Sequence, residues 1–182
     1  MPNWCDNKVT IRGPLTELRQ LADWFSAGKL FHNIKPTPAE LLDNYPFGDP
    51  RNEQRKKDTG YESWYDWRLE HWGTKWDVGP TDGTFLLNEA GTESSIDGRF
   101  LTAWSPPIMI YHALIRLGFD VSAYWYEPGM DLAGGYVNDG CGGHAFDIEI
   151  PASSEDCKAQ LPAELLDAFP IVEMKIDSEN DR

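Results

Sequence analysis

The sequence has few cysteines and few positive charges, and it has no long apolar run. Its three cysteines, Cys5, Cys141 and Cys157, are widely spaced, so they predict neither a disulfide framework nor an iron–sulfur cluster, which takes four thiolates. No run approaches the roughly 18 apolar residues of a membrane span. No basic, apolar-cored leader opens the chain either, so we expect a cytoplasmic protein without membrane association.

Sequence motifs for the common reaction classes are also missing. The chain contains no phosphate-binding glycine loop, GxSxG elbow, HExxH helix, EF-hand loop or dinucleotide fingerprint. An enzyme is therefore the less favoured interpretation, and the sequence predicts no cofactor.

Positive charge is scarce, since 16 basic side chains stand against 30 acidic ones and the net charge is −14. Residues 73–182 carry six basic and nineteen acidic side chains, a net charge of −13, whereas residues 1–42 are near neutral. Such a surface repels phosphate backbones, so direct nucleic-acid binding is not expected. The acidic surface either serves solubility alone or attracts a basic groove on a partner protein, where carboxylates would take the positions of phosphates.

The length of 182 residues fits one domain that carries additions. We predict a main domain over residues 1–150, with an insertion at about 29–62 that four prolines punctuate and that could be a surface elaboration or a lid. Residues 151–182 are predicted to form an extension that packs on the same domain and ends in an acidic tail.

Hydrophobic periodicity predicts the order strand, helix, strand, strand, helix, strand over residues 7–126. The predicted elements of this part are a strand at 7–13, helices at 14–25, 38–42 and 61–72, extended segments at 75–78 and 84–87, a turn-rich stretch at 91–98, a strand at 99–104, a helix from 107 to 117 and a strand at 121–126. This order is the split βαβ of a ferredoxin-like α+β sandwich, an antiparallel sheet with two helices on one face. A hairpin (135–137 and 145–150), a helix (161–169) and a last strand (171–176) should follow as a β/α extension.

Four short blocks stand out in this frame, and three of them contain tryptophan. They are Met1-Pro2-Asn3-Trp4-Cys5-Asp6-Asn7, Trp72-Gly73-Thr74-Lys75-Trp76-Asp77, Thr102-Ala103-Trp104-Ser105-Pro106-Pro107 and Glu127-Pro128-Gly129. On these blocks the chain resembles the YubB-like family, whose members are carried mainly by bacterial plasmids and phages. The resemblance covers residues 1–140 and implies a ferredoxin-like domain and a mobile-element origin, but no reaction.

The tryptophan blocks also supply the first candidate site. Stacking planes beside a cation and a carboxylate could hold a base, a sugar or a peptide side chain. The candidate groove comprises Trp72, Lys75, Trp76, Asp77, Trp104, Ser105 and Glu127, with Trp4 and Asn7 as further members. In an extended segment, Lys75 and Asp77 would project to one face and Trp76 to the other. The alternative is that these tryptophans belong to the core.

Cys141 and His144 form a weaker candidate, because a thiol and an imidazole three residues apart could bind zinc or form a nucleophile–base pair. A structural zinc site needs four ligands, and a hairpin turn explains the intervening glycines equally well. The carboxylates of Glu127, Asp131, Asp139, Asp147 and Glu149 could serve a glycosidase only at a defined separation, which sequence does not supply.

The sequence thus favours a non-enzymatic interaction protein of a mobile element. Its expected partner is a host macromolecule, for example a defence protein or a protein that handles nucleic acid. The alternative is a small enzyme or ligand-binding domain that uses the groove around Trp72–Asp77.

Overall fold

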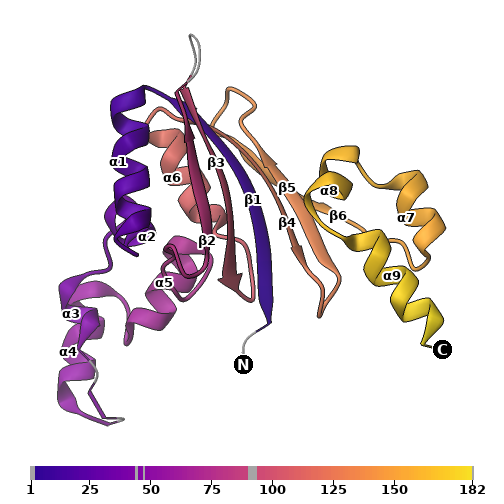
Figure 1. Cartoon of the computed structure of the whole chain (residues 1–182). Coiled ribbons are helices and arrows are strands. Elements are labelled where there is room, and N and C mark those ends of the chain that lie inside the picture. The colour runs from indigo at the N-terminus through magenta and orange to yellow at the C-terminus, as the bar shows by residue number, and fades with distance from the viewer. Residues whose placement is uncertain (1–2, 44, 47, 90–93, 182) are drawn as a thin grey trace.

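The computed structural model describes residues 3–43, 45–46, 48–89 and 94–181, so Met1, Pro2 and the 91–93 part of the predicted turn lie outside the described residues. It contains a six-stranded antiparallel sheet in the order β2-β3-β1-β4-β5-β6 (Figure 1). The strands are β1 (Trp4–Gly13), β2 (Gly83–Asn88), β3 (Ser94–Ala103), β4 (Asp120–Glu127), β5 (Leu132–Val137) and β6 (His144–Ile148).

Helices lie on both sides of this sheet. They are α1 (Leu15–Ser26), α2 (Leu30–Ile34), α3 (Ala39–Leu42), α4 (Pro50–Thr59), α5 (Trp64–Trp72), α6 (Ile108–Arg116), α7 (Ser154–Gln160), α8 (Ala163–Ala168) and α9 (Ile171–Asn180). Helices α1 and α6 cover one face, which we call the inner face, and α7–α9 lie on the other side of the molecule (Figure 1). Among the described residues, no helix has the length and apolar character needed to cross a membrane.

The central part confirms the predicted fold class. The elements β1, α1, β2, β3, α6 and β4 follow in the predicted order, and their strands lie as β2-β3-β1-β4, the arrangement of a ferredoxin-like sandwich. Alternation sets the inner face, because Cys5, Val9 and Ile11 of β1 are buried while Lys8 and Arg12 between and beyond them are exposed. The protein is therefore an α+β fold with an extended antiparallel sheet.

The C-terminal segment differs from the prediction. Residues 171–176, predicted as a strand, form the first part of α9, and this helix continues to Asn180 in the acidic tail. Consecutive residues Ile171 and Val172 are both buried against α7 and α8. A half-buried strand alternates between two faces and cannot bury consecutive residues on one side, whereas a helix can bury both.

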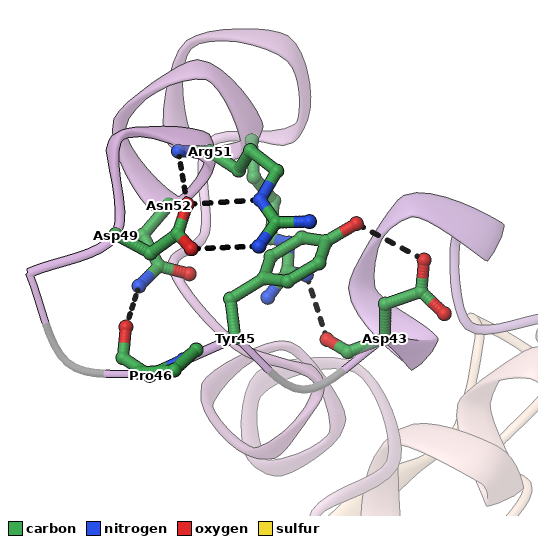
Figure 2. A network of polar contacts seen from close by, with 7 residues as sticks. Asp43, Tyr45, Pro46, Asp49, Arg51 and Asn52 are labelled. Carbon is green, nitrogen blue, oxygen red and sulfur yellow. Dashed lines mark hydrogen bonds and ion pairs between the residues drawn. The ribbon is translucent and has the colours of Figure 1, made fainter.

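The described residues of the 29–62 segment form three short helices, where the sequence predicted only one. Helices α2 and α4 were missed. Helix α4 has no apolar stripe, and its only buried residue is Arg55. Its ends did carry signals, because the Asp49 side chain accepts a hydrogen bond from the backbone N–H of Arg51, and Gly60 ends the helix with φ +83°. Figure 2 shows how polar contacts replace apolar packing here: the Arg51 guanidinium is bound to Asp49 and lies 3.9 Å from the Tyr45 ring.

Two smaller differences concern the sheet. Residues 94–98, predicted as part of a turn, already belong to β3 and pair with residues of β1. Residues 75–78, predicted as extended, are not a strand, because the chain turns there toward α2. That turn decides the geometry of the candidate site.

Candidate interaction surface

The three tryptophan-containing blocks meet at one end of the sheet, where β1 begins and β3 ends. The Asn7 side chain is fully buried and donates hydrogen bonds to Thr102 Oγ1 at 2.8 Å and to the carbonyl of Cys5 at 2.9 Å. The hydroxyl of Tyr111 on α6 donates to Asn7 Oδ1 at 3.3 Å. Buried polar groups stabilise a fold only when they are paired in this way, so Asn7 fixes the register of β1 and β3 and lines no groove.

The second link joins the loop after α5 to the end of β3. The Thr74 hydroxyl donates to the carbonyl of Ala103 at 3.0 Å, and the Ser105 hydroxyl donates to the carbonyl of Gly73. Gly73 has φ +87°, and a Cβ atom there would lie 2.8 Å from the carbonyl oxygen of Pro106. Only glycine fits this close approach, so Gly73, Thr74 and Ser105 hold the two blocks together.

Trp72 lies in the core rather than on a surface. It is fully buried, and its indole N–H donates to the carbonyl of Lys35 at 2.8 Å. The Arg68 guanidinium lies 4.4 Å from the ring, and the Phe31 ring meets it edge-on at 5.9 Å. The inner-face core and the insertion therefore share this residue.

Asp77 is occupied by backbone contacts. Its carboxylate accepts hydrogen bonds from the N–H groups of Phe31 at 2.7 Å, His32 at 3.0 Å and Val78 at 2.9 Å. It thereby satisfies donors in the first turn of α2, as a capping residue does. Burial raises the pKa of the Asp77 carboxyl, while the three N–H donors oppose that rise.

Glu127 has a similar internal role in the β4–β5 turn. It is 1% exposed, and its carboxylate accepts hydrogen bonds from the N–H groups of Gly129 at 2.6 Å and Met130 at 3.1 Å. A buried carboxylate needs such donors. Glu127 therefore shapes the turn.

Three tryptophans remain partly exposed at this end of the sheet, and we call Trp4, Trp76 and Trp104 the tryptophan surface. Their exposed fractions are 39%, 42% and 42%. The rings of Trp4 and Trp76 lie 5.9 Å apart, and Lys75 Nζ lies 4.3 Å from the centre of the Trp76 ring. Lys75 therefore shares a side with Trp76 and not with Asp77, which corrects the predicted distribution of these side chains.

Trp104 has an unusual backbone conformation. Its φ is +73°, in the left-handed region that glycine and asparagine favour and bulky residues avoid. Holding a non-glycine residue there costs about 1–3 kcal/mol. The backbone N–H of Trp104 donates to the carbonyl of Asn3 at 2.9 Å, which joins the residue to the start of β1 beside Trp4. A strained residue thus carries a partly exposed ring beside the start of β1.

Cys141 lies in the β5–β6 turn and His144 begins β6, and the two do not meet in a ligand set. The Asp139 carboxylate accepts hydrogen bonds from the backbone of Cys141 and Gly143, and it lies 3.1 Å from His144 Nδ1. These contacts lower the pKa of Asp139. Within the described residues, no group of three or more histidine, cysteine, aspartate or glutamate side chains could hold a metal ion.

The remaining carboxylates of the glycosidase candidate are dispersed. Asp131 accepts hydrogen bonds from the Tyr126 hydroxyl at 3.0 Å and from Lys175 Nζ at 2.8 Å, so it connects β4 to α9. Asp147 and Glu149 are exposed. No facing pair of free carboxylates emerges from this set.

The structure thus separates the predicted site residues into two groups. Lys75, Trp76 and Trp104 reach the surface, together with Trp4. Trp72, Asp77 and Glu127 are engaged within the fold, and Ser105 joins the loop after α5 to the end of β3. The strain at Trp104 was not foreseen, because nothing in the residues Trp-Ser-Pro-Pro indicates a left-handed backbone.

Comparisons with known proteins add little to this geometry. No protein-family model matches the chain, and no curated protein sequence matches it. A crystal structure of the protein api92 from Yersinia pseudotuberculosis, described by the family model DUF1281, is a distant structural neighbour. It has a TM-score of 0.42 and 11% sequence identity, and the match covers 83% of this chain and 99% of that one.

Proposed function

We propose that this chain is a non-enzymatic interaction protein that binds a basic macromolecular partner through the tryptophan surface and the acidic side chains of its C-terminal half. The observation that carries the proposal is the tryptophan surface itself. Tryptophan dominates the binding energy of protein interfaces, where large rings fill pockets on the partner. Strain held at Trp104 to keep a ring exposed is typical of a functional position.

Charge supports a basic partner. The net charge of −13 over residues 73–182 attracts a positively charged groove and speeds association at low ionic strength. The resemblance of the tryptophan blocks to the YubB-like family supports a mobile-element origin, which we include in the proposal. A host protein with a basic nucleic-acid channel is then the partner that this surface fits best.

The alternative of a small-ligand site around Trp72–Asp77 finds less support. Trp72 is fully buried, and Asp77 is bound to three backbone N–H groups, so neither is available to a ligand. Lys75 and Trp76 remain, and they form part of the tryptophan surface.

The proposal is tested by capture with matched variants. Tagged wild-type protein, Trp76→Ala, Trp104→Asn and Tyr65→Ala are used as baits in a bacterial lysate at low ionic strength, and bound proteins are identified by mass spectrometry. Tyr65 is the control because its 41% exposure matches that of the tryptophans, and it lies on α5. Asparagine tolerates a positive φ, so Trp104→Asn removes the ring without added strain.

We expect one stoichiometric protein that wild type and Tyr65→Ala retain, that both tryptophan variants lose, and that high salt releases. A partner held equally well by all four baits contradicts the assignment of the surface. A bait that retains only nucleic acid contradicts the proposed class of partner.

A further inference from the structure

A small hollow opens beside helix α8 on the face of the sheet opposite the inner face, which we call the outer face. Its volume is about 200 Å³, and the residues that decide its chemistry are Lys8 of β1, Leu86 of β2, Asp97 and Arg99 of β3, and Asp167 and Ala168 of α8. Sites for drug-sized ligands are larger, at about 300–1,000 Å³, so this hollow suits a smaller molecule. None of Trp4, Trp76 and Trp104 lines it, so it is separate from the tryptophan surface.

Two cations from adjacent strands line the hollow. Lys8 lies directly opposite Arg99 in the β1–β3 ladder, and like charges in such a pair destabilise a sheet. The Arg99 guanidinium is compensated by the Asp6 carboxylate, to which it donates a hydrogen bond at 2.6 Å. Within the part of the chain that the structure describes, no carboxylate pairs with Lys8. Lys8 is therefore a cation in a central strand that lacks a counter-charge among these residues.

Two carboxylates border the same hollow, and only one of them is engaged. Asp97 accepts hydrogen bonds from the Thr10 hydroxyl at 3.0 Å and from Asn88 Nδ2 at 2.7 Å. Asp167 is exposed, and no described residue donates a hydrogen bond to its side chain or forms an ion pair with it. Lys8 and Asp167 thus line one hollow without pairing with each other. They present one free charge of each sign, from two different elements.

Leu86 supplies an apolar part of the lining. Its side chain is 62% exposed and lies opposite Asp97 in the β2–β3 ladder, on the outer face. On the inner face of the same strand, the Phe85 ring stacks on Phe25 of α1 at 4.8 Å, which holds β2 in place. A ligand with an aliphatic group therefore gains free energy by covering the exposed part of Leu86.

The balance of charge identifies the class of ligand. A simple anion would bind Lys8 but meet Asp97 and Asp167, and a simple cation would bind Asp167 but meet Lys8 and Arg99. A zwitterion satisfies both free groups and adds no net charge to a chain that already carries −14. We propose that this hollow binds a free α-amino acid with an aliphatic side chain. Its carboxylate pairs with Lys8, its ammonium group pairs with Asp167, and its side chain packs on Leu86.

Such a ligand joins the sheet to the C-terminal helices. Lys8 belongs to β1 and Asp167 to α8, so a molecule that binds both requires α8 to be docked on the sheet. Binding then stabilises the docked form by mass action, to an extent set by the ratio of ligand concentration to Kd. The site is independent of the proposed partner complex, because the tryptophan surface lies where β1 begins. Either proposal can fail while the other stands.

Nuclear magnetic resonance titration of the whole chain with L-leucine tests the site. Isocaproate and isoamylamine are the matched probes, since each keeps the aliphatic chain of leucine and only one of its two charges. We expect L-leucine to shift the amide signals of residues 8, 97–99 and 167 and to bind at least tenfold more tightly than either probe. The absence of any shift at millimolar L-leucine overturns the proposal, and so does equal binding of isocaproate or isoamylamine.

Two variants assign the two charges of the ligand. Lys8→Met and Asp167→Asn should each weaken L-leucine binding at least tenfold, whereas Lys57→Met and Asp23→Asn should bind as wild type does. The control residues are exposed, have no ion-pair partner among the described residues, and lie on α4 and α1. Lys8→Met also removes the like-charge pair with Arg99, so it should be at least as stable as wild type. Wild-type affinity in Lys8→Met or Asp167→Asn contradicts the assignment.

Thiol labelling of Cys157 measures the connection to α8. Cys157 is buried in the cluster that the C-terminal helices form, so it reacts only when they open. L-Leucine at ten times its Kd should slow labelling of Cys157 about tenfold and leave the exposed Cys141 unchanged. If Cys157 reacted at the same rate with L-leucine bound, the ligand would not hold α8 to the sheet and the proposed site would be wrong.

Discussion

The two faces of the sheet are covered by very different amounts of apolar structure. On the inner face, α1, α5 and α6 enclose a continuous core whose largest fully buried side chains include Trp72, Trp125 and Tyr111. On the outer face, α7–α9 cover Tyr126 and Ala133 with a separate, smaller cluster that includes Leu165 and Phe169. The inner face thus holds the ferredoxin-like part together, and the C-terminal helices are an addition to it.

This difference in buried apolar surface predicts that the two sides of the sheet open at different free energies. Proteins open in cooperative units, and a unit with little buried apolar surface opens at a lower free energy than the whole molecule. Loss of a large inner-face side chain should destabilise the entire chain. Loss of an outer-face side chain should release the C-terminal helices while the tryptophan surface stays folded.

Trp72→Ala should have the largest effect. The substitution removes a fully buried indole, its hydrogen bond to Lys35 and its contacts with Arg68 and Phe31. Large-to-small changes of this kind cost about 3–5 kcal/mol. Urea unfolding followed by tryptophan fluorescence and by circular dichroism should show that loss with both probes.

Trp104→Asn is the control for that measurement. It removes a tryptophan of which 42% is exposed, and it relieves a strained backbone. Its stability should stay within about 1 kcal/mol of wild type. If the two variants were equally destabilised, the division between core and surface tryptophans would be wrong.

Leu165→Ala should destabilise the outer cluster by about 2–5 kcal/mol. We expect the lower end of this range, because the helices on one side of the cavity left by the leucine can move to close it. The three free cysteines make the locality of this effect measurable. Cys5 is buried in the inner core, Cys157 in the outer cluster, and Cys141 is exposed. Thiol labelling of Leu165→Ala should accelerate at Cys157 at least tenfold and leave Cys5 unreactive.

Burial raises the pKa of the Cys5 thiol to about 12, so it remains protonated at the pH of labelling. Wild-type protein supplies the baseline, in which Cys141 reacts first. Equal acceleration at Cys5 and Cys157 would contradict separate opening and would make the chain a single cooperative unit.

The division between the inner-face core and the C-terminal helices also explains which elements could be predicted from the sequence. The strand-to-helix order over 7–126 was predictable because β1, α1, α6 and β4 each bury one face and show the matching period. Helix α9 was not, because Val172, Met174 and Ile176 alternate with charged residues as in a strand, and only contact with α7 and α8 decides otherwise.

The candidate site shows a similar limit. The sequence indicated that the tryptophan blocks belong together, but not which rings face solvent. Trp72 and Trp76 are four residues apart, and their opposite environments depend on Gly73 turning the chain and on Asp77 reaching back to α2. Asp77 resembles a site carboxylate in sequence, because its N–H partners Phe31 and His32 are distant in the chain and leave no local pattern. Glu127 has its partners within three residues, in the turn that begins with Glu127-Pro128-Gly129.

Tyr126→Phe should have the smallest effect and sharpens the comparison at the junction of the two regions. Its hydroxyl donates to Asp131, which also binds Lys175 on α9, so the substitution removes a hydrogen bond that holds Asp131 in place for its contact with α9. The loss should be about 1 kcal/mol at neutral pH. Burial raises the pKa of Tyr126 above its ordinary value of 10, so the folded state favours the neutral phenol. That contribution is complete below pH 10 and is lost as pH rises through the folded pKa.

The stability difference between wild type and Tyr126→Phe should therefore shrink on the alkaline side. The control is Tyr124→Phe, whose hydroxyl has no hydrogen-bond partner among the described residues, so this substitution should leave the stability at neutral pH unchanged. Urea unfolding from pH 7 to pH 11 measures both, and a constant difference across that range would show that the Tyr126 hydroxyl does not titrate with unfolding of this junction.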